Sequence, residues 1–169
     1  LLFGLGLEAR TCTLGRIVRH DISCDIRLNG HLTLAAKPRD LDWMRAEAET
    51  LERVMHYPHA RVISALEARA KVDARRFHGG LLDDFGGHLH PLNYALGLAE
   101  AARASGVRLH EHSRVAALDT PSGVTVRTET GAVRARYGVL ACDALLDGLE
   151  PAIARRIMPV ANYLLATEP

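Results

Sequence analysis

A glycine-spaced string near the start, Gly4-Leu-Gly6-Leu-Glu-Ala9, could do chemistry if it formed a nucleotide loop. In the G-x-G-x-x-G/A fingerprint, glycines allow a tight turn and let a pyrophosphate approach the N-terminus of a helix. That turn must follow a β-strand, and only three residues precede Gly4. An acidic residue, Asp25, does follow, but it lies in a segment that alternates like one strand of a hairpin. We therefore interpret the string as part of a helix.

Histidines form two alternating pairs, His88 with His90 and His110 with His112. Residues two apart in extended backbone face the same side, so either pair could begin a metal site. No third ligand follows at a suitable spacing, so we predict no metal and favour hydrogen-bonded or exposed histidines. His90 directly precedes Pro91 and can either cap the helix that Pro91 begins or project toward a cavity beside it. His90 is our candidate for a polar group near an active site, and the sequence assigns no other catalytic residue.

The third candidate is Tyr137-Gly-Val-Leu-Ala-Cys-Asp-Ala144. A strand that runs into small residues before a helix lets the backbone approach a ligand closely. A buried strand that turns a tight corner would have the same composition, and composition alone slightly favours this alternative.

Helices that could position these candidates are predicted from apolar residues at helical spacing over residues 1–20, from Pro38 to before Pro58, over 65–71 and from Pro91. Gly106 suits the left-handed cap that ends the last of them. The expected helices thus cover much of the first two thirds of the chain.

Strands are predicted where alternating apolar residues lie between turn residues. Asn29-Gly30 predicts a hairpin between residues 22–28 and 31–34. A short strand at 61–64 follows. A strand at 80–83, a turn at 84–87, the helix from Pro91 and a strand at 107–111 would form a crossover unit. A meander is expected from the segments 114–118, 124–128, 133–136 and 139–142, with a last strand at 160–166. The predicted fold is a mixture of α/β and α+β.

Composition limits the class of protein. Hydrophobic residues make up 48% of the 169 residues, charged residues 24%, and the net charge is +1, as in an ordinary globular protein. No basic stripe with interleaved aromatic residues suggests a nucleic-acid partner. The apolar stretch near 1–7 is too short to cross a membrane. Three widely spaced cysteines, Cys12, Cys24 and Cys142, fit reduced thiols in the cytoplasm better than a disulfide framework.

From Gly79 the sequence resembles a known family. The runs Gly79–Glu100 and Gly106–Val115 are similar to the D-amino-acid-oxidase-type family of FAD-dependent oxidoreductases, and within it to gamma-glutamylputrescine oxidase-like proteins. Further pieces match in family order over nearly the whole chain: 22–27 with 30–32, 133–141 and 164–169. The resemblance implies a central part of an FAD-binding oxidoreductase fold, with a mixed sheet, antiparallel hairpins and flanking helices.

The resemblance also implies site residues. Val115 corresponds to the valine whose backbone meets the FAD adenine, and Ala141-Cys142-Asp143 to the end of the strand that returns to the flavin. Cys142 stands where the family usually has glycine, and Leu145 stands near an expected aromatic residue. The hairpin at 22–34 and the strand at 160–166 are expected to roof the substrate site.

In the family, FAD takes a hydride from the carbon next to an amine, so the resemblance implies oxidation of a small amine or amino acid at a C–N bond. It implies that residues 1–78 belong to a substrate-binding domain, 79–150 to the FAD-binding domain, and 151–169 to a return into the substrate-domain sheet. The residues at the two ends of the chain suggest an internal fragment of a longer protein. We therefore expect the chain alone to bind FAD weakly or not at all, and to form a homodimer through open sheet edges. The alternatives are a non-catalytic protein-interaction module with the substrate-domain fold and a hydrolase with metal on the histidine pairs.

Overall fold

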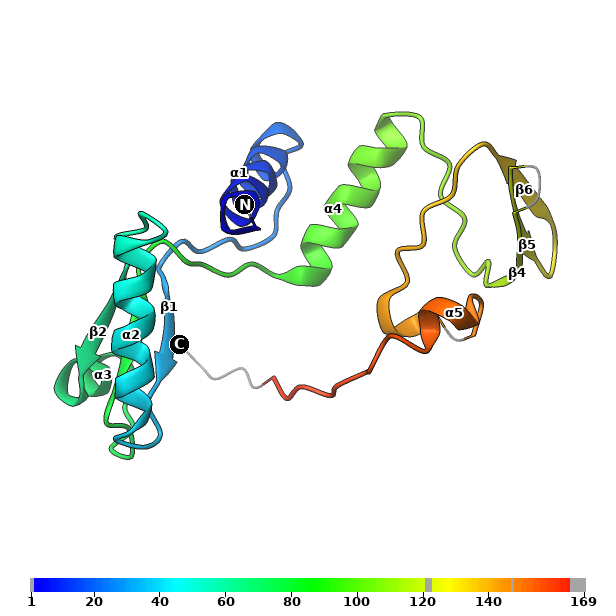
Figure 1. Cartoon of the computed structure of the whole chain (residues 1–169). Coiled ribbons are helices and arrows are strands. Elements are labelled where there is room, and N and C mark those ends of the chain that lie inside the picture. The colour runs from blue at the N-terminus through cyan, green and yellow to red at the C-terminus, as the bar shows by residue number, and fades with distance from the viewer. Residues whose placement is uncertain (1, 121–122, 147, 165–169) are drawn as a thin grey trace. The chain divides into compact units, whose positions relative to one another are not determined.

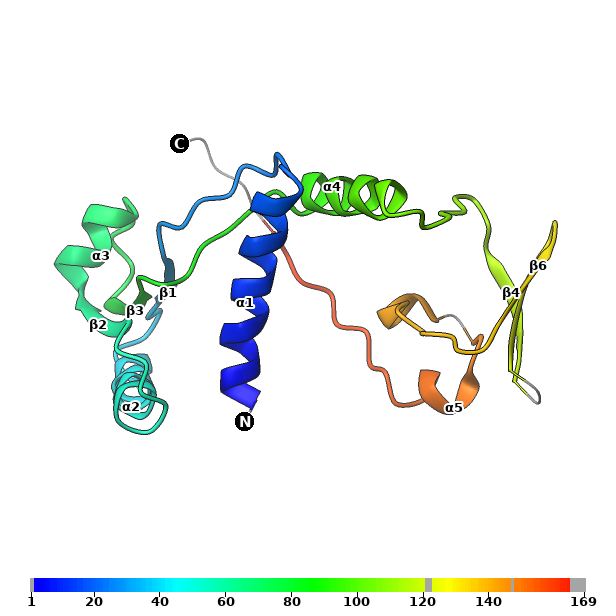
Figure 2. The same ribbon diagram turned by 90° about the horizontal axis from the view of Figure 1, so that it is seen from above.

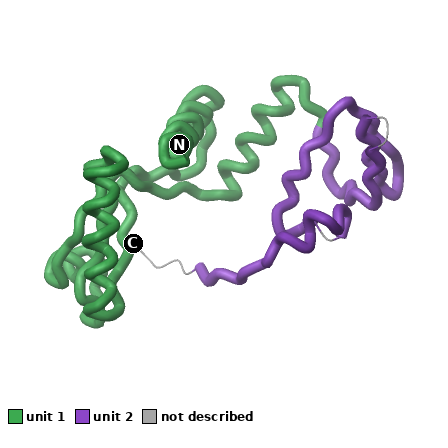
Figure 3. The backbone as a smooth tube through the Cα atoms, in the orientation of Figure 1, with its two compact units in different colours: residues 1–108 green, residues 109–169 purple. Residues whose placement is uncertain are grey.

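The computed structural model describes residues 2–120, 123–146 and 148–164. The chain divides into two compact units, residues 1–108 and 109–169, shown in different colours in Figure 3. The first unit contains α1 (Leu2–Arg19), β1 (His31–Leu34), α2 (Asp40–Arg53), β2 (Ala60–Ser64), α3 (Ala65–Lys71), β3 (Gly79–Asp83) and α4 (Pro91–Ala104). The second contains β4 (Val115–Asp119), β5 (Val124–Thr128), β6 (Ala132–Ala135), the 3-10 helix η1 (Asp143–Leu146) and α5 (Pro151–Ala154).

The first unit is built on an antiparallel sheet in the order β1-β3-β2, against which α2 and α3 pack (Figure 1). Met44 on α2 and Ile63 on β2 are each 1% exposed and lie in the core of this unit. Gly79 in the central strand has φ of +142°, and a Cβ there would lie 2.5 Å from the carbonyl oxygen of Ile63. The strand can lie this close to β2 because glycine has no side chain.

The predicted hairpin between 22–28 and 31–34 is wrong. Residues 31–34 do form β1, but β1 pairs with β3. The earlier segment runs beside residues 86–90 instead, where the backbone groups of Arg27 and His88 exchange two hydrogen bonds of 2.9 Å. The Asn29-Gly30 signal considers only segments that are adjacent in sequence. In the structure β3 pairs with β1 on one edge and with β2 on the other, and both of these strands precede it by many residues.

The four predicted helices are confirmed as α1, α2, α3 and α4. Gly4 and Gly6 lie inside α1, so the interpretation of the glycine string as helix is also confirmed. Gly106, with φ of +86°, follows α4. The C-terminal end of α1 lies beside α4 (Figure 2), where Ile17 and Ile22 pack with Tyr94 and Leu98.

An aromatic group joins α1 to the end of the sheet. Tyr57 is 8% exposed, and its hydroxyl donates to the Asp83 carboxylate at 2.8 Å. The Phe85 ring lies between the guanidinium of Arg10, 3.7 Å from its centroid, and the stacked ring of His59. Asp83 also accepts from the backbone N–H of Phe85, so this group holds the turn that follows β3.

The strand predicted at 107–111 is wrong, and with it the crossover unit, because these residues belong to neither sheet. The meander is confirmed over β4, β5 and β6, which pair antiparallel in that order. The strand predictions at 139–142 and 160–164 are wrong, since both segments run as irregular chain. Residues 165–166 lie outside the described residues. Apolar alternation marked these segments, but a strand needs a ladder partner, and none of the described strands pairs with them.

Candidate functional site

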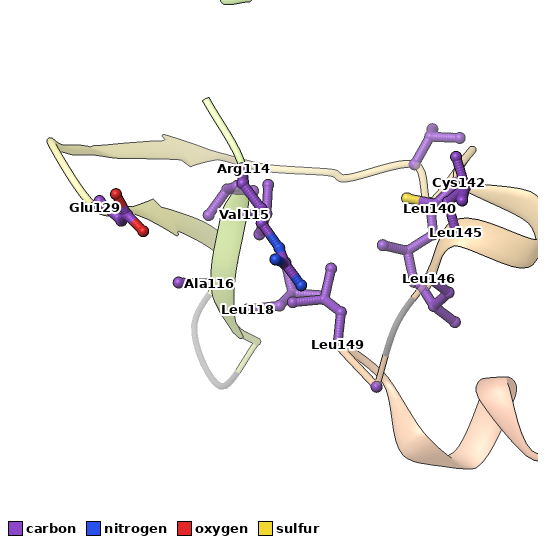
Figure 4. Close-up of a pocket in the computed structure, with 13 residues that line it drawn as sticks. Arg114, Val115, Ala116, Leu118, Glu129, Leu140, Cys142, Leu145, Leu146 and Leu149 are labelled. Carbon is purple, nitrogen blue, oxygen red and sulfur yellow. The ribbon is translucent and has the colours of Figure 1, made fainter. Parts of the chain in front are cut away.

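A pocket of about 630 Å³ lies within the second unit, between β4 and the segment that leads into and beyond η1 (Figure 4). Its lining is mostly apolar and brings together two segments that the sequence analysis had singled out separately. The lining residues are Arg114, Val115, Ala116, Leu118, Val126, Glu129, Val139, Leu140, Cys142, Leu145, Leu146, Gly148 and Leu149.

One wall begins with Val115, the first residue of β4. The β4–β5 register pairs Val115 with Thr128 and Ala117 with Arg127, so Ala116 is a bulge. A bulged residue is left out of the ladder, and β4 is an edge strand of this sheet. Among the described strands, none pairs with the start of β4 on the side away from β5.

The facing wall comes from Val139 to Leu149. Cys142 lines the pocket, whereas Ala141 and Asp143 do not belong to its lining. Asp143 has φ of +47°, a conformation that aspartate tolerates better than most residues, and the N–H of Leu145 donates to the carbonyl of Cys142 at 2.9 Å. This turn directs Leu145 and Leu146 into the wall. The sequence analysis predicted Val115 and Cys142 as site residues, and the structure brings them to one pocket.

Two charged lining residues, Arg114 and Glu129, were missed by the sequence analysis. Their place depends on the register between β4 and β5, which puts the turn after Thr128 beside the start of β4. The Thr128–Gly131 contacts tie that turn, with the N–H of Thr128 donating to the carbonyl of Gly131 at 2.8 Å. The signal in the sequence was the pair Thr130-Gly131 directly after Glu129, and it indicates a turn rather than a site.

The arrangement suits a flat ligand with an apolar face and a polar edge. Leucine side chains from both walls offer the apolar surface, and the backbone at the edge of β4 offers donors and acceptors. Ligand pockets commonly combine such a lining with a few polar groups that fix orientation.

His90 lies in the first unit as the N-cap of α4, where its Nδ1 accepts from the backbone N–H of Asn93 at 3.3 Å. Its backbone N–H donates to the carbonyl of Cys24 at 2.7 Å. His90 therefore has the capping role that the sequence allowed, while a role near substrate stays a prediction. A second pocket of about 510 Å³ lies beside α4, lined by Ile22, Leu96 and Gly97 among others.

Three further features of the described residues concern metal-binding clusters, membrane-spanning helices and disulfides. Within residues 2–120, 123–146 and 148–164, no three His, Cys, Asp or Glu side chains gather as they would around a metal ion. In the same residues, no helix has the length and apolar character needed to cross a membrane. The three cysteines are free thiols: Cys12 is exposed, Cys24 buried and Cys142 partly buried.

Comparison of the chain with known proteins gives consistent matches. The family described as "DAO: FAD dependent oxidoreductase" matches residues 1–169. Gamma-glutamylputrescine oxidoreductase of Escherichia coli is 38% identical over 90% of this chain and 36% of its own length. The probable oxidoreductase OrdL of Haemophilus influenzae is 33% identical over 99% of this chain and 40% of its own. The chain thus spans about two fifths of the length of the curated relatives it matches.

Solved structures share the fold. Glycine oxidase from Geobacillus kaustophilus aligns with a TM-score of 0.71 at 22% identity, covering 86% of this chain and 40% of that chain. L-proline dehydrogenase from P. horikoshii aligns with a TM-score of 0.69 at 17% identity over the same shares. These likenesses confirm the predicted fold class, a mixture of helices and antiparallel sheets found in part of such proteins. The family match over the whole chain shows that the chain belongs to the FAD-dependent oxidoreductase family.

Proposed function

We propose that this chain is part of an enzyme that uses FAD to oxidise a C–N bond of a small amine or amino acid. Membership of the FAD-dependent family supports the cofactor. The relatives named gamma-glutamylputrescine oxidoreductase and glycine oxidase support an amine or amino-acid substrate. The chain spans about two fifths of these relatives, which supports the further proposal that it is an internal fragment of a longer protein that carries out the reaction.

The observation that carries the proposal is the pocket in the second unit. The family resemblance assigned Val115 to the FAD adenine and Cys142 to the end of the strand that returns to the flavin. Both residues line the same pocket although 27 positions separate them in the sequence. The pocket fits the adenine end of FAD, because adenine is a flat ring with an apolar face and a hydrogen-bonding edge. Val115 at the edge of β4 would meet the adenine edge, and the leucines would cover its faces.

The remaining predicted cofactor residues belong to the same proposal. Ala141 and Asp143 flank Cys142 and would shape the backbone where the chain passes the cofactor. FAD, when bound, supplies the hydride acceptor for oxidation of the amine-bearing carbon. The residues of this chain contribute binding and orientation, with 79–150 as part of the FAD-binding domain and 1–78 and 151–169 as parts of the substrate-binding domain.

His90 is proposed as a polar group near the substrate. Its Nδ1 is used by the cap, which leaves Nε2 for a further hydrogen bond. The change His90→Asn in the full-length enzyme keeps a good N-cap, whereas His90→Ala removes it. If His90 contacts substrate, both variants raise KM or lower kcat. Unchanged kcat and KM in both variants would contradict this role.

Cellular location and assembly are also proposals. The three free thiols support a reducing, cytoplasmic environment. Exposed apolar residues such as Val139 (90%) and Tyr137 (82%) support homodimerisation of the isolated chain. A monodisperse monomer in light scattering at high protein concentration would contradict the dimer.

The experiment that tests the function uses the full-length protein encoded by the complete reading frame. We expect it to purify with a yellow flavin, which anaerobic incubation with an amine or amino acid bleaches. A panel of polyamines, primary amines and amino acids identifies the substrate class, and alcohols serve as controls. A protein without flavin, or a flavin reduced by alcohols and by none of the amines, would contradict the proposal. Of the two expectations for the isolated chain of 169 residues, weak or no FAD binding, the presence of the pocket favours weak binding that millimolar ligand reveals.

A further inference from the structure

Specificity in the pocket of the second unit depends on few polar side chains. Of the described residues that line it, Arg114 and Glu129 are the charged ones, and the others are apolar, glycine or cysteine. In a pocket of this kind the apolar surface provides affinity for many flat ligands. The few polar groups decide which ligand fits.

The backbone of Glu129 is held in place beside the start of β4. Val115 pairs with Thr128, so Glu129 follows the residue that faces Val115 across the sheet. The turn that contains Glu129 is tied on both sides, because the N–H of Gly131 also donates to Oγ1 of Thr128 at 3.1 Å. Figure 4 shows the Glu129 side chain at the side of the pocket where β5 ends, opposite the wall formed by Leu145 and Leu146.

The Glu129 carboxylate is available to a ligand. Among the described residues, none makes a hydrogen bond or an ion pair with it. Asp119, at the other end of β4, differs because it pairs with Arg127 at 2.8 Å. One acidic side chain of this sheet thus stabilises the sheet itself, and the other lies at the pocket without a protein partner in the described part of the chain.

The chemistry of a carboxylate is selective, because its oxygens accept hydrogen bonds and do not donate them. Adenine carries an amino group at C6, which donates. Hypoxanthine is the same ring with a carbonyl at C6, which accepts and would face the carboxylate unfavourably. Pockets built to bond a polar substituent discriminate strongly against an analogue that lacks it.

We propose that Glu129 is the specificity-determining residue that selects adenine in this pocket, by accepting a hydrogen bond from the C6 amino group. The inference rests on the proposed function, since it takes the adenine end of FAD as the occupant. It adds a residue on the turn between β5 and β6, outside both segments that the family resemblance assigned to the cofactor.

The test compares AMP with inosine monophosphate in NMR titrations of the whole 169-residue chain at millimolar nucleotide. We expect AMP to shift the amide resonances of Val115 and Leu146 and to bind about tenfold more tightly than inosine monophosphate, as one charge-assisted hydrogen bond allows. The variant Glu129→Gln presents both an acceptor and a donor, so the preference should fall to about twofold or less. Glu47→Gln, an exposed change of the same charge in the first unit, is the control and should keep the preference.

The outcomes separate the inference from the proposed function. If AMP leaves the pocket resonances of the unchanged chain unmoved, the adenine pocket itself is refuted. If AMP binds but Glu129→Gln keeps the full preference over inosine monophosphate, the role of Glu129 is overturned while the pocket stands. The variant Glu129→Asp provides a second check, because its shorter side chain should also lower the preference in a chain whose spectrum shows it folded.

Discussion

The two compact units differ in how they bury apolar residues. In the described part of the chain, nine of the ten buried apolar residues lie in the first unit, and Leu146 is the one in the second. Both units expose some large apolar side chains, but in the second unit such side chains line the pocket, among them Leu145 at 86% and Val139 at 90%. Apart from Leu146, the leucines around its pocket are half-buried or exposed.

The difference separates two roles. The first unit has a core that stabilises it through packing, whereas the second unit has apolar surface arranged around a pocket. Burial of such surface by a ligand or by further protein would contribute about 25 cal/mol for each Å² removed from water. The second unit is therefore the part whose stability should depend on what binds to it.

The largest expected effect comes from removing a core side chain of the first unit. Met44→Ala should lower the free energy of unfolding by about 2–5 kcal/mol, because Met44 is 1% exposed and its loss leaves a cavity. The only tryptophan, Trp43, lies next to it on α2, so tryptophan fluorescence during urea unfolding reports on this unit.

Leu145→Ala is the matched change in the second unit. Its side chain is 86% exposed, so the expected change in the free energy of unfolding is within about 0.5 kcal/mol. Equal effects of the two substitutions would contradict the contrast between the units.

A smaller effect is expected at Tyr57, where Tyr57→Phe removes the hydrogen bond to Asp83 and should cost about 1 kcal/mol. The control is Tyr137→Phe in the second unit, where the side chain is 82% exposed and the change should be nearly neutral. A loss at Tyr137 as large as that at Tyr57 would contradict the contrast.

Tyr57 also gives a pH dependence. Burial raises the pKa of Tyr57 above its ordinary value of about 10, and the hydrogen bond to Asp83 and the negative charge of Asp83 raise this pKa further. The folded state therefore holds the Tyr57 proton more tightly than the unfolded chain. This stabilisation is fully present below about pH 10 and is lost as pH rises above it. Urea unfolding from pH 8 to 11 should show a fall in stability that is smaller in Tyr57→Phe.

The smallest effect is expected at the start of α3. Ser64 and Glu67 form a capping box, and the pKa of Glu67 is lowered mainly by the hydrogen bond from the Ser64 backbone, with Arg61 adding to it. A lowered pKa stabilises the folded state above the ordinary value of 4.5, and this contribution is lost as pH falls through the lowered pKa. Glutamine also completes a capping box, so Glu67→Gln should remove only this acid dependence. The free energy of unfolding is measured at pH 3 and pH 6 in the unchanged chain and in Glu67→Gln. The same dependence on pH in both would contradict the contribution of the Glu67 carboxylate to the capping box.

The sequence predicted local features well and distant pairings poorly. Pro91 and Gly106 bound α4 through backbone preferences that act within a few residues, and both were interpreted correctly. The segments 107–111 and 139–142 have the apolar alternation of strands, yet alternation does not provide a ladder partner. The hairpin at Asn29-Gly30 failed because β3, about 50 residues later, competes for β1.

The same limit applies to the pocket. The resemblance predicted a cofactor role for Val115 and Cys142 because each lies in a segment with its own sequence pattern, and this role stays a prediction. Glu129 could not be found in this way, since it reaches the pocket through the register between β4 and β5. Tyr57 was missed for the same reason, because its partner Asp83 is 26 residues away.

The most direct test of the pocket as an adenine site is alkylation of Cys142, which lines it. In a Cys12→Ser background, Cys24 is buried, so Cys142 is the thiol expected to react with iodoacetamide in the folded chain. Millimolar ADP should slow this reaction several-fold. Ribose 5-phosphate, which carries a sugar and a phosphate but neither adenine nor flavin, should leave the rate unchanged. An alkylation rate that ADP does not change, or that ribose 5-phosphate slows equally, would contradict the assignment of this pocket to the adenine of FAD.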